Sequence, residues 1–222
     1  MNRKSSKATI YYPILIDLRG RRCVVIGGGK VALRKVKMLL DCGANVSVIS
    51  PKPHPDIAKL SKERAIHLIQ RDYEAQDLKG AVIAIACTDV KEVNCKVADE
   101  AREGGALVNV ADDPKPSDFI IPSFFRRGDL TVAVSTAGMS PALARKIRTK
   151  LEKSFGEEYA SLLSLIGEVR STIKEKGYIV GAEVWQEALD IDLLTQLVRS
   201  GQRKKAKIIL LSKLEARKAE SA

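Results

Sequence analysis

The chain has 222 residues, a formal net charge of +11, and 45% hydrophobic against 29% charged residues. This balance is typical of a folded globular protein and excludes an intrinsically disordered chain. The longest apolar run, residues 81–87, is far too short to span a bilayer, which excludes a membrane protein. The basic, polar N-terminus lacks the apolar stretch of a secretory signal, so we expect a cytoplasmic location.

The cysteines and histidines give no indication of a metal centre. The cysteines are Cys23, Cys42, Cys87 and Cys95, and no two of them have C-x-x-C spacing. The two histidines stand apart from them in the sequence. We therefore expect reduced thiols that pack as small apolar side chains, and no metal site.

The positive charge is concentrated near the two ends of the chain. Residues 1–50 carry ten Lys and Arg against two acids, and residues 201–222 carry seven against two. Such an excess favours an anionic partner, which leaves open nucleic acid, an anionic lipid surface and a polyanionic small molecule. Aromatic residues are only 5% of the chain and do not interleave with the basic clusters, which argues against a surface that stacks single-stranded nucleic acid.

The first half of the chain alternates short β-branched strands with amphipathic helices. Strands are predicted over residues 22–26, 45–50, 65–69, 81–87 and 107–110, and helices over 30–42, 57–64 and 90–103. Such alternation predicts an α/β fold in which a parallel sheet is covered on both faces.

The pattern changes after residue 112. Residues 113–117 have the composition of a turn or linker, and strands predicted over 119–123 and 130–135 flank a hairpin loop at 126–129. A helix is predicted from residue 142 to about 155, and the remainder from residue 159 is predicted to be helical, with breaks near Gly177 and Gly201.

A glycine-rich turn lies between the first predicted strand and the first predicted helix. Gly27, Gly29 and Ala32 form a G-x-G-x-x-A pattern, which is typical of dinucleotide binding in this βαβ context. The glycines let the backbone approach a pyrophosphate, and the helix start offers N–H groups to it. The alternative is a plain tight turn. Ser50 and Lys52 stand where a ribose-binding acid usually follows the second strand, so the residues alone leave NAD and NADP open.

Two further segments are candidates for chemistry. Asp112 follows the fifth predicted strand, at the sheet edge where ligands gather, and is either a general base or a turn residue. Residues 135–141 are small and rich in hydroxyl groups, and they precede a helix that carries Arg145. They either bind an anion at the helix N-terminus or provide a simple cap, with Ser140 as the capping residue.

Several motifs in a fixed order resemble one known family. YPILIDLRGR over residues 12–21 precedes the glycine pattern, and Asn109-Val110-x-Asp112-x-Pro114 follows the fifth strand. Phe119-Ile120-x-Pro122-Ser123 then leads to V-A-V-S-T-x-G-x-S-P-x-L-A-R over residues 132–145. Over residues 10–155 this order resembles the precorrin-2 dehydrogenase/sirohydrochlorin ferrochelatase family, the dehydrogenase module of siroheme synthase.

The resemblance implies an enzyme that oxidises precorrin-2 to sirohydrochlorin with NAD as hydride acceptor. Some members also insert ferrous iron to give siroheme. It further implies a homodimer, with an NAD-binding Rossmann domain over residues 1–112, a dimerisation segment over 113–150 and a helical domain over 151–222. Precorrin-2 is a polycarboxylate tetrapyrrole, so Arg126, Arg127 and Arg145 are basic groups that would attract it.

The resemblance implies that Asp112 is the catalytic base and that the cofactor contacts lie at residues 28–31 and 50–52. No metal ligands are predicted. The predicted cofactor-binding residues are Gly27, Gly28, Gly29, Lys30, Val31, Ser50, Pro51, Lys52 and Thr88. The predicted substrate-binding residues are Asn109, Ser135, Thr136, Gly138, Ser140 and Arg145. Nucleic acid and membrane are not expected as partners. The alternatives are a non-enzymatic NAD-binding regulatory module and, less in keeping with the motifs, a basic nucleic-acid-binding protein.

Overall fold

A computed structural model of the protein describes residues 9–111 and 113–220, apart from the side chains of 217–220. The chain forms two compact units, unit 1 up to Ile121 and unit 2 from Pro122. The predicted α/β class with a helical C-terminal part is confirmed. The predicted three-part division at residues 112 and 150 stays a prediction. Within the described residues, no helix has the length and apolar character needed to cross a membrane.

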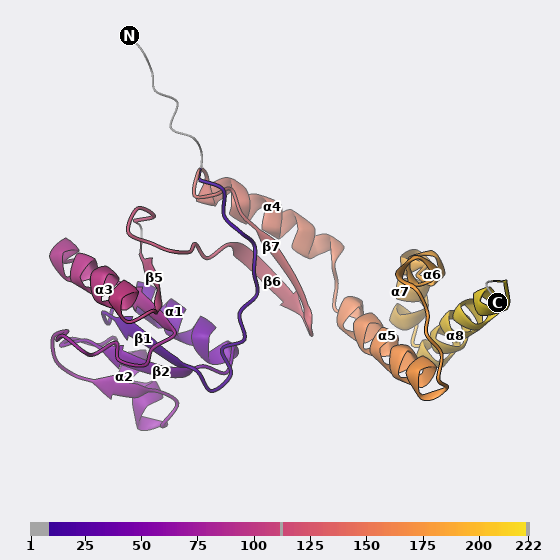
Figure 1. The fold of residues 1–222 in the computed structure, drawn as a ribbon, viewed down its shortest axis with the longest axis horizontal. Helices are drawn as coiled ribbons and strands as arrows, with labels where there is room; N and C mark the ends of the chain where they lie inside the picture. Colours follow the sequence, from indigo (N-terminus) through magenta and orange to yellow (C-terminus); the bar gives the residue numbers. More distant parts are fainter. Residues whose placement is uncertain (1–8, 112, 221–222) are drawn as a thin grey trace, which may run out of the picture. The chain divides into compact units, whose positions relative to one another are not determined.

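Unit 1 contains a five-stranded parallel sheet in the order β3-β2-β1-β4-β5. The strands are β1 (Arg22–Ile26), β2 (Asn45–Ile49), β3 (His67–Ile69), β4 (Ile83–Ala86) and β5 (Leu107–Val110) (Figure 1). Each lies within a predicted strand, and β1 and β5 match at both ends. The strand order places the first βαβ crossover at the centre of the sheet, where β1 separates β2 from β4.

Alternating side chains of the strands divide the core of unit 1 into two layers. On one face, Val25 and Val48 pack with α1 (Lys30–Asp41) and α2 (Pro55–Lys62). On the other face, Val24 packs with α3 (Lys91–Glu103). The strands are therefore apolar throughout, because both of their faces are covered.

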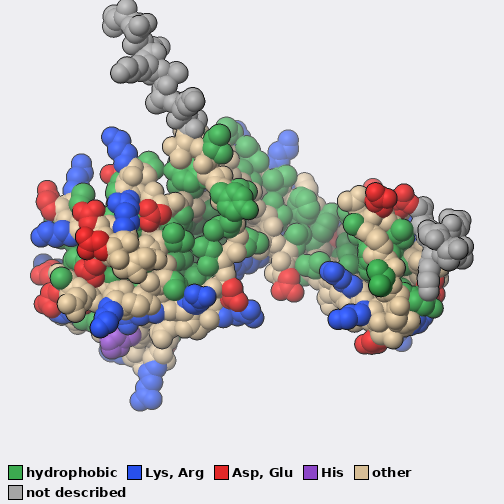
Figure 2. Space-filling model, viewed as in Figure 1, with side chains coloured by type: hydrophobic (Ala, Val, Ile, Leu, Met, Phe, Trp, Pro, Cys, Tyr) green, Lys and Arg blue, Asp and Glu red, His purple; other side chains and the backbone are tan. Residues whose placement is uncertain are grey.

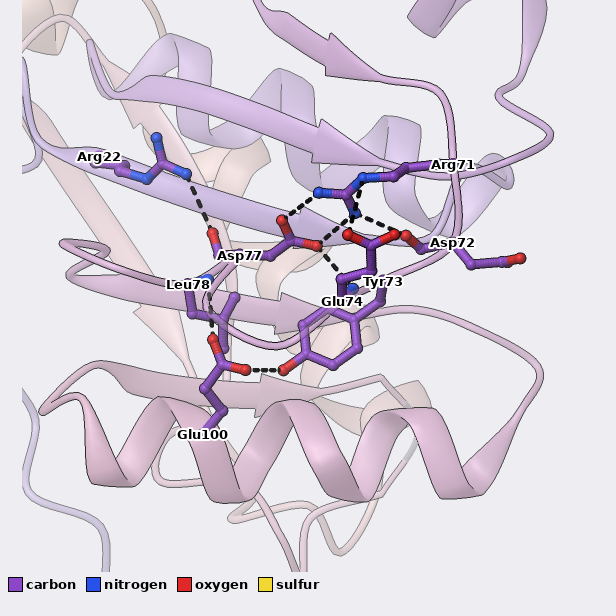
Figure 3. A network of polar contacts seen from close by, with 8 residues as sticks. All are labelled: Arg22, Arg71, Asp72, Tyr73, Glu74, Asp77, Leu78 and Glu100. Atoms are coloured by element: carbon purple, nitrogen blue, oxygen red, sulfur yellow. Dashed lines mark hydrogen bonds and ion pairs between the residues drawn. The ribbon is translucent and has the colours of Figure 1, made fainter.

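An irregular segment, residues 70–82, connects β3 to β4 and is held by side chains instead of helical hydrogen bonds (Figure 3). Arg71 donates to both carboxylate oxygens of Asp77, at 2.8 and 2.7 Å. Glu100 on α3 accepts from the Tyr73 hydroxyl, and Arg22 donates to the Asp77 carbonyl at 3.1 Å. The hydrogen bond from Arg71 lowers the pKa of Asp77, and burial raises the pKa of Tyr73.

Unit 2 begins with a two-stranded antiparallel sheet of β6 (Ser123–Arg127) and β7 (Leu130–Val134). The predicted first strand over 119–123 is wrong, because the hairpin starts at Ser123 and includes two residues that were expected in its loop. The preceding segment is bonded to β5 instead: Asp118 N donates to Val108 O, and Asn109 Nδ2 donates to Phe119 O. Proline at 122 has no N–H for a ladder, which agrees with the later start.

The described part of unit 2 continues with five helices. They are α4 (Pro141–Ser154), α5 (Glu158–Glu175), α6 (Ala182–Ala188), α7 (Ile191–Arg199) and α8 (Arg203–Glu220). The hairpin packs on α4, and Leu165, Leu194 and Leu210 are fully buried between α5, α7 and α8. The predicted breaks near Gly177 and Gly201 are confirmed, and both glycines have positive φ. A further break precedes α7, where Asp190 caps the helix by accepting from Leu193 N.

The ion pair of Arg71 with Asp77 should make the stability of unit 1 depend on pH. Because the folded-state pKa of Asp77 is lowered, its contribution to stability is present above the unfolded pKa of about 3.9 and is lost as the pH falls through the folded value. We expect Asp77→Asn to lower the free energy of unfolding by about 2 kcal/mol at pH 7. The difference from wild type should shrink as the pH falls below 4.

Chemical denaturation at pH 7 and pH 3 measures this difference. Asp72→Asn is the matched control, because Asp72 is an exposed carboxylate in the same segment. An equal loss of stability in Asp77→Asn at both pH values would contradict the prediction.

Candidate cofactor and active site

Gly27 ends β1 in a conformation that only glycine adopts without strain. Its φ is +112°, and its N–H donates to the carbonyl of Ile49 at 2.9 Å. A Cβ at this position would lie 2.6 Å from the carbonyl oxygen of Cys87, which follows β4. The backbone after β1 is therefore in direct contact with the backbone after β4.

Gly28 is in contact with the loop that follows β2. A Cβ here would overlap Ser50 Oγ and lie 2.8 Å from Pro53 Cα. The Gly28 carbonyl also accepts from His54 N at 2.8 Å, and His54 is the N-cap of α2. The loop of residues 50–54, which carries the predicted Pro51 and Lys52, is thereby fixed against the glycine turn.

The start of α1 is open at Gly29. Gly29 is the N-cap of α1. Among the described residues, no side chain caps this end, and a Cβ on Gly29 would meet no atom within 4 Å. Lys30 and Val31 follow and are exposed. Helix N–H groups beside an open backbone suit a pyrophosphate, so these residues fit a dinucleotide.

Thr88 is held by a residue that the sequence analysis missed. Asn94 on α3 is 8% exposed, donates to Thr88 O at 2.9 Å, and accepts from Thr88 Oγ1 at 2.8 Å and from Thr88 N at 3.3 Å. Thr88 N would also lie 3.2 Å from a Cβ on Gly27, so Asn94 fixes the loop that contacts the glycine turn. A polar residue on the apolar side of the predicted helix was the only signal of this role.

Asn109 and Asp112 are the predicted site residues at the end of β5, and the structure describes the first of them. Asn109 is 7% exposed and its amide donates to Phe119 O at 3.0 Å, so this donor is used within unit 1. Asp112, the predicted base, lies outside the described residues. Its neighbours are placed: Ala111 N donates to Ala86 O, and Asp113 forms a bridge with Val110. Ala111 and Asp113 thus lie at the carboxyl ends of β4 and β5, the edge that also carries Gly27.

In unit 2, the predicted substrate-binding residues form one turn before α4. Ser135 Oγ accepts from Ala137 N, Thr136 Oγ1 accepts from Ser140 N, and Ser140 Oγ accepts from Leu143 N at 3.2 Å. Ser140 therefore caps α4, as one of the two interpretations proposed. Gly138 has a φ of +82°, and Arg145 is exposed on the first turns of α4.

Some of the basic side chains are already bound to other residues of the fold. Arg127 lies over the Phe125 ring, donates to Phe155 O at 3.0 Å and pairs with Glu157, so its side chain is a structural support of unit 2. On the face shown in Figure 2, Lys and Arg side chains are scattered among Asp and Glu. Among the residues described, no group of three or more His, Cys, Asp or Glu is placed to hold a metal.

The Cys23 thiol is buried. Burial raises the pKa of Cys23 to about 11, so this thiol stays protonated at neutral pH.

Comparison with known proteins agrees with both units. A family model described as "Putative NAD(P)-binding" matches residues 14–123, and one described as "Sirohaem biosynthesis protein central" matches residues 127–154. A solved structure named "SirC, precorrin-2 dehydrogenase" is 26% identical with a TM-score of 0.69, covering 93% of this chain and 100% of that one. The chain is therefore similar to members of the precorrin-2 dehydrogenase/sirohydrochlorin ferrochelatase family. The resemblance found in the sequence motifs is thereby confirmed.

The curated relatives extend beyond the region that matches. Siroheme synthase of Methylobacillus flagellatus is 38% identical over 208 residues, which are 92% of this chain and 44% of the relative. Siroheme synthase 1 of Aeromonas salmonicida is 36% identical over 198 residues, which are 88% and 42%. The chain thus spans less than half the length of the curated relatives it matches.

Paired glycine substitutions test the candidate cofactor site. We expect Gly28→Ala to lower the free energy of unfolding by about 1–3 kcal/mol, because the new methyl group overlaps the loop after β2. It should also weaken NAD binding, since that loop must move. Gly29→Ala has open space for its Cβ and is the control for stability. Thermal melting and calorimetric titration with NAD measure the two effects. A fully stable Gly28→Ala with unchanged NAD affinity would contradict the close contact.

A second pair tests the role of Asn94. Asn94→Ala leaves the Thr88 backbone groups without their partner and should cost about 2 kcal/mol of stability while weakening NAD binding. Val97→Ala, on the same helix and fully buried, should cost a similar amount by leaving a cavity but leave NAD affinity in place. Both affinities are measured well below the melting temperatures. Equal NAD affinity in the two variants would show that Asn94 has no positioning role.

Proposed function

We propose that the protein catalyses the NAD-dependent oxidation of precorrin-2 to sirohydrochlorin in tetrapyrrole biosynthesis. The observation that carries this proposal is the glycine turn, whose backbone and open helix start suit a dinucleotide at the sheet edge where β5 ends. The match to the family model "Sirohaem biosynthesis protein central" and the name of the SirC structure support the choice of substrate. NAD, when bound, supplies the hydride acceptor.

The residues of unit 1 divide the work. The start of α1, with Gly29, Lys30 and Val31, binds the pyrophosphate, and the loop of residues 50–54 lies beside the adenosine ribose. The loop at Thr88, held by Asn94, closes the other side of the glycine turn. Asp112 accepts or relays the proton that leaves as the substrate is oxidised. Orientation of the two reactants supplies most of the rate gain.

The substrate carries several carboxylates, and the chain carries matching charge. The net charge of +11 attracts a polyanion, and Arg145 is an exposed cation at the start of α4. The hydroxyl-rich turn of residues 135–140 lies directly before that helix. We propose that this turn and Arg145 bind substrate carboxylates. The cytoplasmic location expected from the sequence stays a prediction.

The direct test is an anaerobic assay of the purified full chain with precorrin-2 and NAD. Conversion to sirohydrochlorin is followed by absorbance, with and without ferrous iron. We expect oxidation that requires NAD. Iron insertion faster than in a protein-free control would add the chelatase activity, with ferrous iron as its substrate. Binding of NAD without any oxidation would favour the regulatory module instead.

Asp112 is tested by a conservative substitution with a neighbouring control. Asp112→Asn removes the proposed base and should lower kcat by about 100-fold or more, while NAD affinity is retained. Asp113→Asn is the control, because Asp113 is exposed and its carboxylate caps Lys115 N. Turnover near the wild-type rate in Asp112→Asn would remove Asp112 from the mechanism.

We propose that the protein is a homodimer in which the β6–β7 hairpin and α4 take part. Among the described residues this sheet has only two strands, so both of its outer edges lack a neighbour. Large apolar side chains are exposed beside it, with Met139 at 83% and Leu143 at 50%. Light scattering should give twice the 24.3 kDa chain mass. The mass of a single chain at micromolar concentration would contradict the dimer.

A further inference from the structure

We propose that the cofactor site also accepts NADP, with Lys52 binding the 2′-phosphate of its adenosine ribose. This inference rests on the proposed function, because it assigns the cofactor range of the same site. Its starting point is the loop of residues 50–54, which is fixed against the glycine turn at the carboxyl end of β2.

The loop lacks the group that normally excludes NADP. In the common arrangement, an acid at the end of the second strand binds the ribose hydroxyls and repels a 2′-phosphate. The sequence of the loop is Ser-Pro-Lys-Pro-His, which contains no carboxylate. The repulsion that would make the site selective for NAD is therefore missing from this loop.

The backbone of the loop is held in one place. Ser50 is 4% exposed, and its hydroxyl accepts from Lys52 N at 3.3 Å. The Lys52 carbonyl oxygen lies 2.9 Å from the Cβ position of Gly28, and His54 N donates to the Gly28 carbonyl. Two prolines, Pro51 and Pro53, flank Lys52 and restrict its backbone further. Lys52 is thus attached within contact distance of the pyrophosphate-binding turn.

The Lys52 side chain is available for a ligand. It is exposed, and within the described parts of the chain its ammonium makes no ion pair. The nearest acid along the chain, Asp56, faces His54, with 3.8 Å between Asp56 Oδ2 and His54 Nδ1. The basic residue that follows β3, Arg71, is already bound to Asp77. Lys52 therefore supplies the positive charge of the loop, and lysine binds phosphate as a compact point charge.

The experiment measures binding and needs no turnover. Calorimetric titration of the full chain uses NAD⁺, NADP⁺, 5′-AMP and 2′,5′-ADP, so that each pair differs only in the 2′-phosphate. Lys52→Glu and Lys52→Gln are compared with wild type. Lys79→Glu is the matched control, because it makes the same change of charge at an exposed lysine. Lys79 precedes β4 and so lies toward the amino ends of the strands, whereas Lys52 follows the carboxyl end of β2.

We expect wild type to bind NADP⁺ within about tenfold of NAD⁺. Lys52→Glu should shift the ratio of the two dissociation constants by about tenfold or more against NADP⁺, and Lys52→Gln by less. Lys79→Glu should leave the ratio as in wild type. The fragments should follow the same order.

Two results overturn the inference and leave the proposed function standing. One is wild-type binding of NAD⁺ with NADP⁺ weaker by about a hundredfold or more. The other is a ratio in Lys52→Glu equal to that of wild type. Failure of both dinucleotides to bind would overturn the proposed function itself.

Discussion

The contact of two glycines with two neighbouring loops is the constraint on which the cofactor site depends. Gly27 lies against the backbone after β4, and Gly28 lies against the loop after β2, both at distances that leave no room for a Cβ. These contacts bring together the ends of three adjacent parallel strands. The start of α1 is left open as a result, because the chain turns directly from the sheet into the helix. A single short turn thus determines both the packing of the strand ends and the access of a ligand to helix N–H groups.

The connection from β3 to β4, elsewhere in unit 1, is stabilised in a different way. The connection from β3 to β4 contains no helix, so its backbone groups lack the regular partners that a crossover helix would provide. Arg71, Asp77, Tyr73 and Glu100 replace that helix with a polar network that joins the connection to α3 (Figure 3). Asn94 on the same helix holds the loop at Thr88. Helix α3 therefore holds the connection before β4 through its C-terminal half and the loop after β4 through its N-terminal half.

In unit 2, some basic side chains are bound within the fold and others are exposed. Arg127 is bound to Phe155 O and Glu157, and Arg203 shares Glu168 with Lys207 on the helical side. These pairs account for several of the basic residues that made the sequence look suited to a polyanion. Arg145 stays exposed beside the capped start of α4. The net charge alone thus overstates the number of cations that are available to a ligand.

The sequence by itself determined the order of the elements in unit 1, the glycine turn and the resemblance to one family. Strand and helix periodicity are local properties, and the glycine pattern is a local backbone requirement. The tertiary structure decided the start of β6, because residues 117–119 bond to β5 in place of a hairpin partner. It also decided the roles of Asn94 and Asp77, which depend on contacts with segments 6 residues away in the chain for the first and up to 55 for the second. Such roles follow from which segments meet in space, and a pattern of neighbouring residues does not contain that information.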